Sequence, residues 1–193
     1  MRQKGFRPIN FVLFLHEKRF AMLQAFKISK QMKKIGILSD THGYWDDRYA
    51  EHFAGCDEIW HAGDIGSVEI IEKLSKVATL RAVYGNIDGT PVKLLTAKTL
   101  RFRIEQTDVL LTHIGGYPGK YAPEIKDELL RDTPDLMVCG HSHILKVMFD
   151  KKLNMLHINP GAAGKYGFHK VRTLIRFVID KEEMKDLEVI ELA

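Results

Sequence analysis

Five short apolar segments of this chain each run into residues that can bind a metal ion, and this pattern restricts the fold more than any other feature. The segments with their polar ends are Ile37–His42, Ile59–Asp64, Val83–Asn86, Leu110–His113 and Val138–His143. Short apolar runs that end in Gly, Asp or Asn are typical of buried strands. Because parallel strands place their carboxyl ends along one edge of a sheet, we expect these polar ends to form one site.

The periodicity of the sequence predicts a layered α/β protein from Lys33 onward. In the first half, strands are expected at Ile35–Ser39, Glu58–Ala62 and Leu80–Tyr84, and helices at Arg48–Phe53 and Val68–Lys76. After Gly89, strands are expected at Thr99–Gln106, Asp108–His113, Asp135–Cys139, Leu145–Phe149, Met155–Ile158 and Val171–Ile179, and the one clear helix is Pro123–Arg131. So many strands would overfill one twisted sheet, so we predict two sheets packed face to face with helices outside.

Length and charge distribution divide the chain into one domain and an extension. With 193 residues, of which 45% are hydrophobic, the chain can bury one core, and we expect a single domain over residues 32–193. The formal net charge of +4 arises from residues 1–31, which hold seven basic residues against Glu17, whereas the rest is slightly acidic. We interpret residues 1–31 as a basic N-terminal extension, disordered or dispensable, and Met32 as a candidate natural start.

The extension does not match a targeting signal, and the cysteines favour a reducing compartment. The apolar run Ile9–Leu15 is interrupted by Asn10, lacks a cleavage pattern and is too short to cross a membrane. Cys56 and Cys139 form no CxxC pair and are too few for a disulfide framework. We therefore expect a cytoplasmic protein without a membrane span.

The polar motifs are weak singly and strong as a set. Gly-Asp, Gly-Asn and Asp-x-His sequences are common in ordinary turns, and a single Thr-His is more often a strand-end histidine. Gly140-His141-Ser142-His143 is the strongest motif, because two imidazoles two residues apart can reach two adjacent ions. All five motifs occur in order, each directly after an apolar strand, and this favours a metal site.

The residue types also suit a particular chemistry. A carboxylate such as Asp64 can bridge two cations, Gly63 allows a tight turn before it, and Asn86 supplies a carbonyl without a further charge. Mixed nitrogen and oxygen donors suit Mn, with Ni, Fe or Zn as alternatives, rather than Ca. Two ions about 3.5 to 4 Å apart can generate a bridging hydroxide and hold phosphoryl oxygens, which predicts phosphoester hydrolysis without a protein nucleophile.

The complete series of motifs resembles the calcineurin-like metallophosphoesterases. Three further motifs resemble the small prokaryotic phosphodiesterases of the YfcE group: His61-Ala62-Gly63-Asp64, Gly85-Asn86-x-Asp88 and Asn159-Pro160-Gly161. The resemblance implies a four-layer αββα sandwich of two mixed sheets with a dimetal site at strand ends. It implies one ion held by Asp40, His42, Asp64 and His143, and another held by Asp64, Asn86, His113 and His141. Asp64, Asn86 and His113 would act in catalysis through these ions, with Asp64 as the bridge.

Two departures from the superfamily narrow the expected activity. Many members place a histidine after the metal-binding asparagine, where it can protonate the leaving group, but this chain has Ile87. We therefore expect small phosphodiesters with good leaving groups as substrates. Asp88 is interpreted as a turn former rather than a substitute acid. The segment Gly63–Ser67 lacks the arginine of the phosphoprotein phosphatases, which weakens a phosphomonoesterase interpretation.

Other functions remain open at this stage. A metal-binding scaffold without activity, like the phosphodiesterase-like subunit of the retromer coat, would carry the same fold. A nuclease could use the same metals, but the slightly acidic domain lacks a basic stripe, so no stable nucleic-acid partner is expected. A homo-oligomer is compatible with the sequence. The remaining polar residues that we expect to be structural or solvated are His61, Lys120, His157, Lys165, His169 and Lys170.

Overall fold

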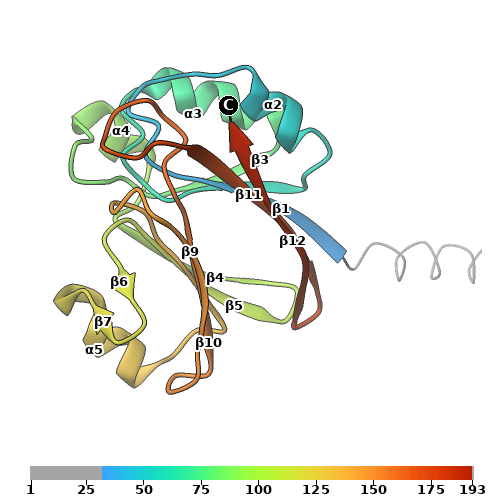
Figure 1. The fold of residues 1–193 in the computed structure, drawn as a ribbon, viewed down its shortest axis with the longest axis vertical. Helices are drawn as coiled ribbons and strands as arrows, with labels where there is room; N and C mark the ends of the chain where they lie inside the picture. The colour runs from blue at the N-terminus through green and yellow to red at the C-terminus, as the bar shows by residue number, and fades with distance from the viewer. Residues whose placement is uncertain (1–31, 193) are drawn as a thin grey trace, which may run out of the picture. The chain divides into compact units, whose positions relative to one another are not determined.

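The structure, a computed structural model, describes residues 32–192, which form two five-stranded sheets (Figure 1). The interpretation of residues 1–31 as an extension falls outside the described residues. The first sheet has the order β12-β11-β1-β2-β3, with β1 (Met32–Leu38), β2 (Glu58–His61), β3 (Thr79–Ala82), β11 (Arg172–Asp180) and β12 (Glu183–Leu192). The second has the order β4-β5-β8-β10-β9, with β4 (Thr99–Ile104), β5 (Thr107–Thr112), β8 (Leu136–Val138), β9 (Leu145–Asp150) and β10 (Met155–Pro160).

Both sheets are mixed, as predicted. In the first, β1, β2 and β3 are parallel and β11 pairs with β1 in the antiparallel sense. In the second, β5, β8 and β10 are parallel, and β4 and β9 are antiparallel edge strands. The helices are α2 (Arg48–Phe53), α3 (Val68–Val77), α4 (Thr90–Leu95) and α5 (Pro123–Arg131), and a small ribbon is formed by β6 (Gly116–Tyr117) and β7 (Lys120–Tyr121).

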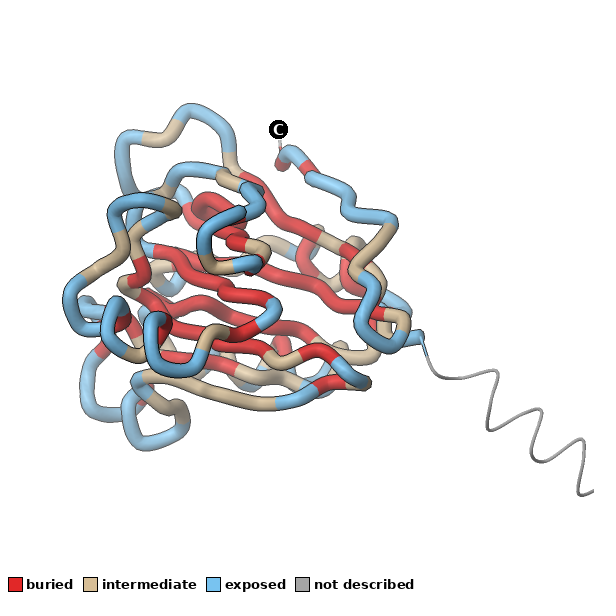
Figure 2. Tube along the Cα trace, turned by 90° about the horizontal axis from the view of Figure 1, so that it is seen from below, coloured by how far each residue is buried: buried red, intermediate tan, exposed pale blue. Residues whose placement is uncertain are grey.

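The main core lies between the two sheets, where the buried strands run through the middle of the domain (Figure 2). Its centre is Trp60, which is fully buried and meets Phe102 and Phe177 edge to face at centroid distances of 5.1 and 5.9 Å. A second cluster joins the first sheet to α2 and α3, and a third joins the second sheet to α5. The predicted order of helix, sheet, sheet and helix layers is therefore confirmed.

Side chains alternate along β1, so this strand packs against the second sheet on one face and against the helices on the other. Ile35 and Ile37 point into the cluster between the sheets, whereas Leu38 belongs to the cluster beneath the helices. Gly36 lies on the helix side, where a β-carbon would come within 2.5 Å of the Phe53 ring. The glycine lets α2 pack directly on the sheet.

The structure corrects the expectation of a single helix after Gly89, because α4 begins at Thr90. Pro91 in its first turn presets a helical φ, but only Val92 is buried, so the segment lacks an apolar period. Strand β12 and the short β6–β7 ribbon were also not predicted. β12 is an edge strand rich in charged residues, so its pattern differs from that of buried strands.

None of the helices among residues 32–192 has the length and apolar character needed to cross a membrane.

Candidate metal centre

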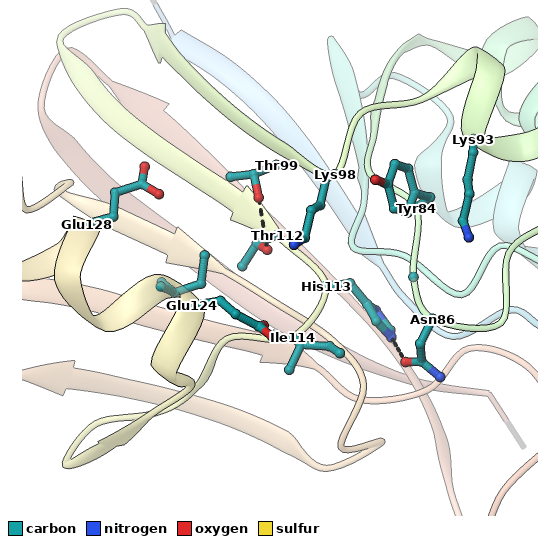
Figure 3. Close-up of a pocket in the computed structure, with 12 residues that line it drawn as sticks. Tyr84, Asn86, Lys93, Lys98, Thr99, Thr112, His113, Ile114, Glu124 and Glu128 are labelled. Atoms are coloured by element: carbon teal, nitrogen blue, oxygen red, sulfur yellow. Dashed lines mark hydrogen bonds between the residues drawn. The ribbon is translucent and has the colours of Figure 1, made fainter.

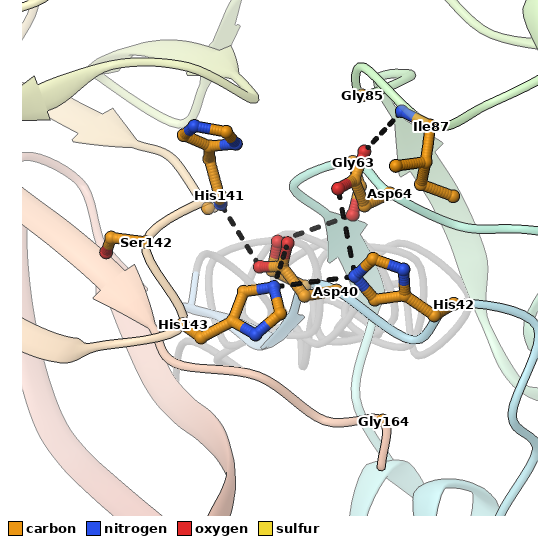
Figure 4. A network of polar contacts seen from close by, with 12 residues as sticks. Asp40, His42, Gly63, Asp64, Gly85, Ile87, His141, Ser142, His143 and Gly164 are labelled. Carbon is orange, nitrogen blue, oxygen red and sulfur yellow. Dashed lines mark hydrogen bonds and ion pairs between the residues drawn. The ribbon is translucent and has the colours of Figure 1, made fainter. Parts of the chain in front are cut away.

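The loops after β1, β2, β5 and β8, together with the loop after Val83, bring the polar ends of both sheets together (Figure 4). The residues gather as two groups whose donor atoms lie within 4.8 Å of one another. The first group is Asp40, His42 and His143, and the second is Asp64, His113 and His141. Asn86 joins the second group, because its Oδ1 lies 3.1 Å from His113 Nε2. The grouping agrees with the two coordination spheres that the resemblance implies.

Asp64 stands between the two groups. Its Oδ1 lies 3.2 Å from Nε2 of His113, and its Oδ2 lies 3.7 Å from Nε2 of His42. The two oxygens of one carboxylate therefore face imidazoles of different groups, as a bridging ligand requires. In the first group, Asp40 Oδ1 lies 3.3 Å from His143 Nε2.

The backbone at the centre adopts conformations that are costly for residues with a side chain. Positive φ angles occur at Asp40 (55°), His42 (47°), Asp64 (52°), His141 (70°) and His143 (57°). Each costs roughly 1 kcal/mol or more for a residue other than glycine. The loops are held by backbone hydrogen bonds between strand ends, including Asp40 N to Gly63 O at 3.0 Å and His42 N to Asp64 O at 2.9 Å. Strain concentrated at five clustered donors is typical of a functional site.

Two glycines permit the close approach of the loops. A β-carbon on Gly63 would lie 2.5 Å from Nδ1 of His113, and Gly63 also has a φ of 93°. A β-carbon on Gly85 would overlap the Asp64 carboxylate and lie 2.5 Å from its backbone nitrogen. Gly-Asp and Gly-Asn are common dipeptides in turns, but here the packing around Asp64 requires the glycine of each.

The protonation pattern of His113 indicates that a cation fits this centre. Its Nδ1 donates to the Ala62 carbonyl at 2.8 Å, so Nε2 is the nitrogen that carries the lone pair in the neutral ring. That Nε2 faces oxygens of both Asn86 and Asp64. Lone pairs this close repel one another unless a proton or a cation lies between them. Burial has the largest single effect and lowers the pKa of His113, but the hydrogen bond with Asp64 and the charges of Asp40 and Asp64 together outweigh it, so the pKa is raised.

The first group shows the same need for positive charge. Asp40 is fully buried, and its Oδ1 has no hydrogen-bond partner among the described residues. Nε2 of His42 and Nε2 of His143 face each other at 3.4 Å. A buried carboxylate and converging imidazole nitrogens are costly without a counterion and are suitable ligands for divalent metals. The two Asp and His groups therefore indicate divalent metal binding.

His61 and Asp88 hold the loops around the centre in place. His61 is fully buried; its Nδ1 accepts from Gly63 N at 3.2 Å, and its Nε2 lies 2.9 Å from Thr41 Oγ1. Burial lowers the pKa of His61 to about 4, so the ring is neutral. Asp88 accepts a hydrogen bond from the amide of Gly85 at 2.8 Å, within its own turn. It also accepts from the amides of Ile65 and Gly66 at 3.1 and 2.7 Å and so joins two loops, a role that the sequence did not predict.

Asn159 has a structural role that the motif alone did not explain. Its Nδ2 donates to Gly140 O at 2.8 Å and to Ser142 Oγ at 3.1 Å, and its Oδ1 accepts from Gly161 N at 3.0 Å. The side chain fixes the loop that carries His141 and His143. His157, in contrast, is a buried structural residue whose Nε2 donates to Gly116 O at 3.0 Å.

Two aromatic residues next to the centre were not identified as such from the sequence. The ring of His169, expected to be structural or exposed, lies 5.3 Å from that of His143, and its Nε2 donates to Gly164 O at 2.9 Å. The ring of Tyr166 lies 5.0 Å from that of His42. Both belong to a loop that reaches the centre through tertiary contacts, and no local motif marks them.

The side chain of Ile87 is 46% exposed, whereas its amide donates to Asp64 Oδ1 at 3.1 Å. The backbone of this position orients the carboxylate, and the side chain has no proton to transfer.

Among the lysines expected to be solvated, Lys165 lies over the ring of Tyr44 at 4.5 Å, and Lys120 and Lys170 line cavities that open to the surface.

Comparison with known proteins identifies the family. The sequence profile of the calcineurin-like phosphoesterase superfamily domain matches residues 32–182. The chain belongs to this superfamily, and the resemblance seen in the motifs is confirmed.

Individual relatives agree with this assignment. A probable metallophosphoesterase from Methanothermobacter thermautotrophicus is 32% identical over 136 residues, which cover 66% of this chain and 76% of that protein. The structure of a novel archaeal phosphodiesterase is similar with a TM-score of 0.67 at 25% identity, covering 82% of this chain and 99% of that one. A Vps29 variant (D62A) from Entamoeba histolytica shares the fold with a TM-score of 0.63 at 16% identity, covering 83% and 99%.

Proposed function

We propose that this protein is a phosphodiesterase that uses two divalent metal ions to hydrolyse small phosphodiesters. Asp40, His42 and His143 would hold one ion, and Asn86, His113 and His141 the other, with Asp64 shared between them. The similarity to an archaeal phosphodiesterase supports this proposal.

The observation that carries the proposal is that two cavities border the second group of proposed ligands. The first, of about 320 Å³, is lined by Asn86 and His113 (Figure 3). The second, of about 560 Å³, is lined by His141, and Ile114 borders both cavities. A phosphodiester carries two organic arms and a monoester one. Two cavities that border different ligands of the same group match the two arms of a diester.

The residues around the centre define what the protein itself contributes. Two divalent ions bound here would supply an activated water and positive charge for the phosphoryl oxygens. The backbone amide of Ile87 and the brace formed by His61 fix the orientation of the carboxylates and the loop. The Ile87 side chain supplies no proton to the leaving group. This arrangement favours aryl and other good leaving groups.

Manganese is the first choice of metal, with nickel, iron and zinc as alternatives. The proposed ligands combine imidazole nitrogens with carboxylate and amide oxygens, a donor set that is too rich in nitrogen for calcium. Six of the seven donors belong to the two Asp and His groups, and Asn86 adds a neutral oxygen.

The test compares diesters with monoesters on the full chain. After removal of metals by a chelator, the protein is reconstituted separately with Mn²⁺, Ni²⁺, Zn²⁺ and Mg²⁺ and assayed with bis(4-nitrophenyl) phosphate and 4-nitrophenyl phosphate. We expect metal-dependent turnover with a higher kcat/KM for the diester. Asp64→Asn should lose turnover, whereas Asp127→Asn, an exposed carboxylate on α5 outside both cavities, should retain it.

Three outcomes would contradict the proposal in distinguishable ways. Preference for the monoester would indicate a phosphomonoesterase. Preference for single-stranded or duplex DNA over both aryl esters would indicate a nuclease. Stoichiometric metal binding without turnover of any ester would indicate a metal-binding scaffold.

A further inference from the structure

The cavity beside Asn86 and His113 contains two lysines that the proposed metal centre does not use. Lys93 lies on α4, and Lys98 directly precedes β4. Figure 3 shows the Lys98 side chain extending toward Thr112 and Lys93 lying on the side of Tyr84 and Asn86. The same cavity is thus lined by two lysines and by two of the residues proposed to hold the second ion.

Neither lysine is neutralised by a carboxylate of the described part of the chain. The ion pairs found among residues 32–192 involve other cations. Lys93 lies 5.4 Å from the centre of the Tyr84 ring, a contact that leaves its charge uncompensated. Two uncompensated cations that line one small cavity attract an anionic ligand.

The opposite wall limits what kind of anion can enter. Glu124 and Glu128 lie one turn apart on α5 and line the same cavity, and neither forms an ion pair with a lysine or arginine among the described residues. Their charges repel a chain of phosphates that would extend across the cavity. The volume of about 320 Å³ lies at the small end of ligand sites, so the cavity suits a short arm.

We propose that this cavity binds an anionic group at the end of one ester arm of the substrate. The preferred substrates are then phosphodiesters in which a short arm carries one further carboxylate or phosphate, which pairs with Lys93 and Lys98. This inference rests on the proposed function, because binding of the phosphoryl group at the metal centre determines how far the ester arm reaches into the cavity.

The test uses substrates that differ only in the charge of the arm. 4-Nitrophenyl 3-carboxypropyl phosphate and its isosteric 3-carbamoylpropyl amide have the same leaving group, so the ratio of their kcat/KM values isolates recognition of the arm. We expect the carboxylate to be preferred about tenfold, the size given by two solvent-exposed ion pairs. The double variant Lys93→Gln/Lys98→Gln should bring the ratio close to one, and 0.5 M NaCl should weaken the preference.

Two further measurements make the test independent of turnover and of general charge effects. Binding of 4-phosphonobutanoate and of 4-phosphonobutanamide to the metal-loaded protein is measured by calorimetry, and the lysine side chains are followed by NMR. The matched control is Lys126→Gln, an exposed lysine on α5 that does not line the cavity. It should keep both the kinetic ratio and the preference for the carboxylate ligand.

The outcomes separate this inference from the proposed function. Turnover of both esters with a ratio that the double variant does not change overturns the inference and leaves the phosphodiesterase proposal standing. Lysine-dependent binding of 4-phosphonobutanoate without turnover of any ester supports the anion site and overturns the proposed catalysis. Equal binding of the two phosphonates to the parent protein and to the double variant also overturns the inference.

Discussion

Replacing Gly85 by alanine should disable the metal centre with little effect on the rest of the fold. An ideal β-carbon at this position overlaps the Asp64 carboxylate and lies 2.5 Å from the Asp64 nitrogen and 2.7 Å from Cγ. Because one of these contacts is with the backbone, a side-chain rotation cannot relieve it. Asp64 must move by roughly 1 Å, a displacement that can cost about 10²-fold in catalytic rate.

The effect on stability should be smaller and separable. The overpacking should cost about 1 to 3 kcal/mol in the free energy of unfolding. Gly85 does not have a positive φ, so alanine introduces no backbone strain of its own. Gly89→Ala is the matched control, because its β-carbon would meet only Pro91 Cδ at an ordinary 3.7 Å. Metal content by inductively coupled plasma mass spectrometry and diester kinetics test the effect. Full metal content and normal kcat in Gly85→Ala would refute the reasoning.

Three further perturbations test other parts of the account. Ile87→His should raise the rate for alkyl diesters by up to about 10²-fold and change aryl diesters little, because it supplies a proton donor; equal gains for both would argue against this role. Trp60→Ala should destabilise the domain by about 3 to 5 kcal/mol in urea unfolding, and a loss below 1 kcal/mol would contradict the packing between the sheets. Hydrogen bonds from Arg48 and Arg172 lower the pKa of Asp46, so the ionised carboxylate should stabilise the fold above the ordinary aspartate pKa, and this stabilisation should disappear as the pH falls below about 4. Asp46→Asn should reduce the loss of unfolding free energy between neutral and acidic pH. An unchanged pH profile in the variant would exclude this role of Asp46.

The positions of the proposed ligands were predictable from the sequence because they follow the ends of buried strands. Apolar runs fix the strands, and parallel strands place their carboxyl ends together, so Asp40, Asp64 and His113 could be assigned to one site. The division into two groups came from the family resemblance. The spacing in the sequence alone did not specify which oxygen of Asp64 faces which histidine.

The features that escaped prediction depend on tertiary contacts or on weak local patterns. Helix α4 buries only Val92, and β12 is a charged edge strand, so neither shows the period of a buried element. Tyr166 and His169 approach the centre from a loop more than a hundred residues after His42. The cavities could not be predicted either, because their walls combine α4, α5, the second sheet and loops that are far apart in the sequence.

The metal stoichiometry of the protein tests the central claim most directly. Native mass spectrometry of the metal-free chain titrated with Mn²⁺ should show two ions bound per chain, and Asp64→Ala should fail to retain the pair because both ions lose a shared ligand. A wild-type protein that binds no ion or one ion, or an Asp64→Ala variant that still holds two, would contradict the account.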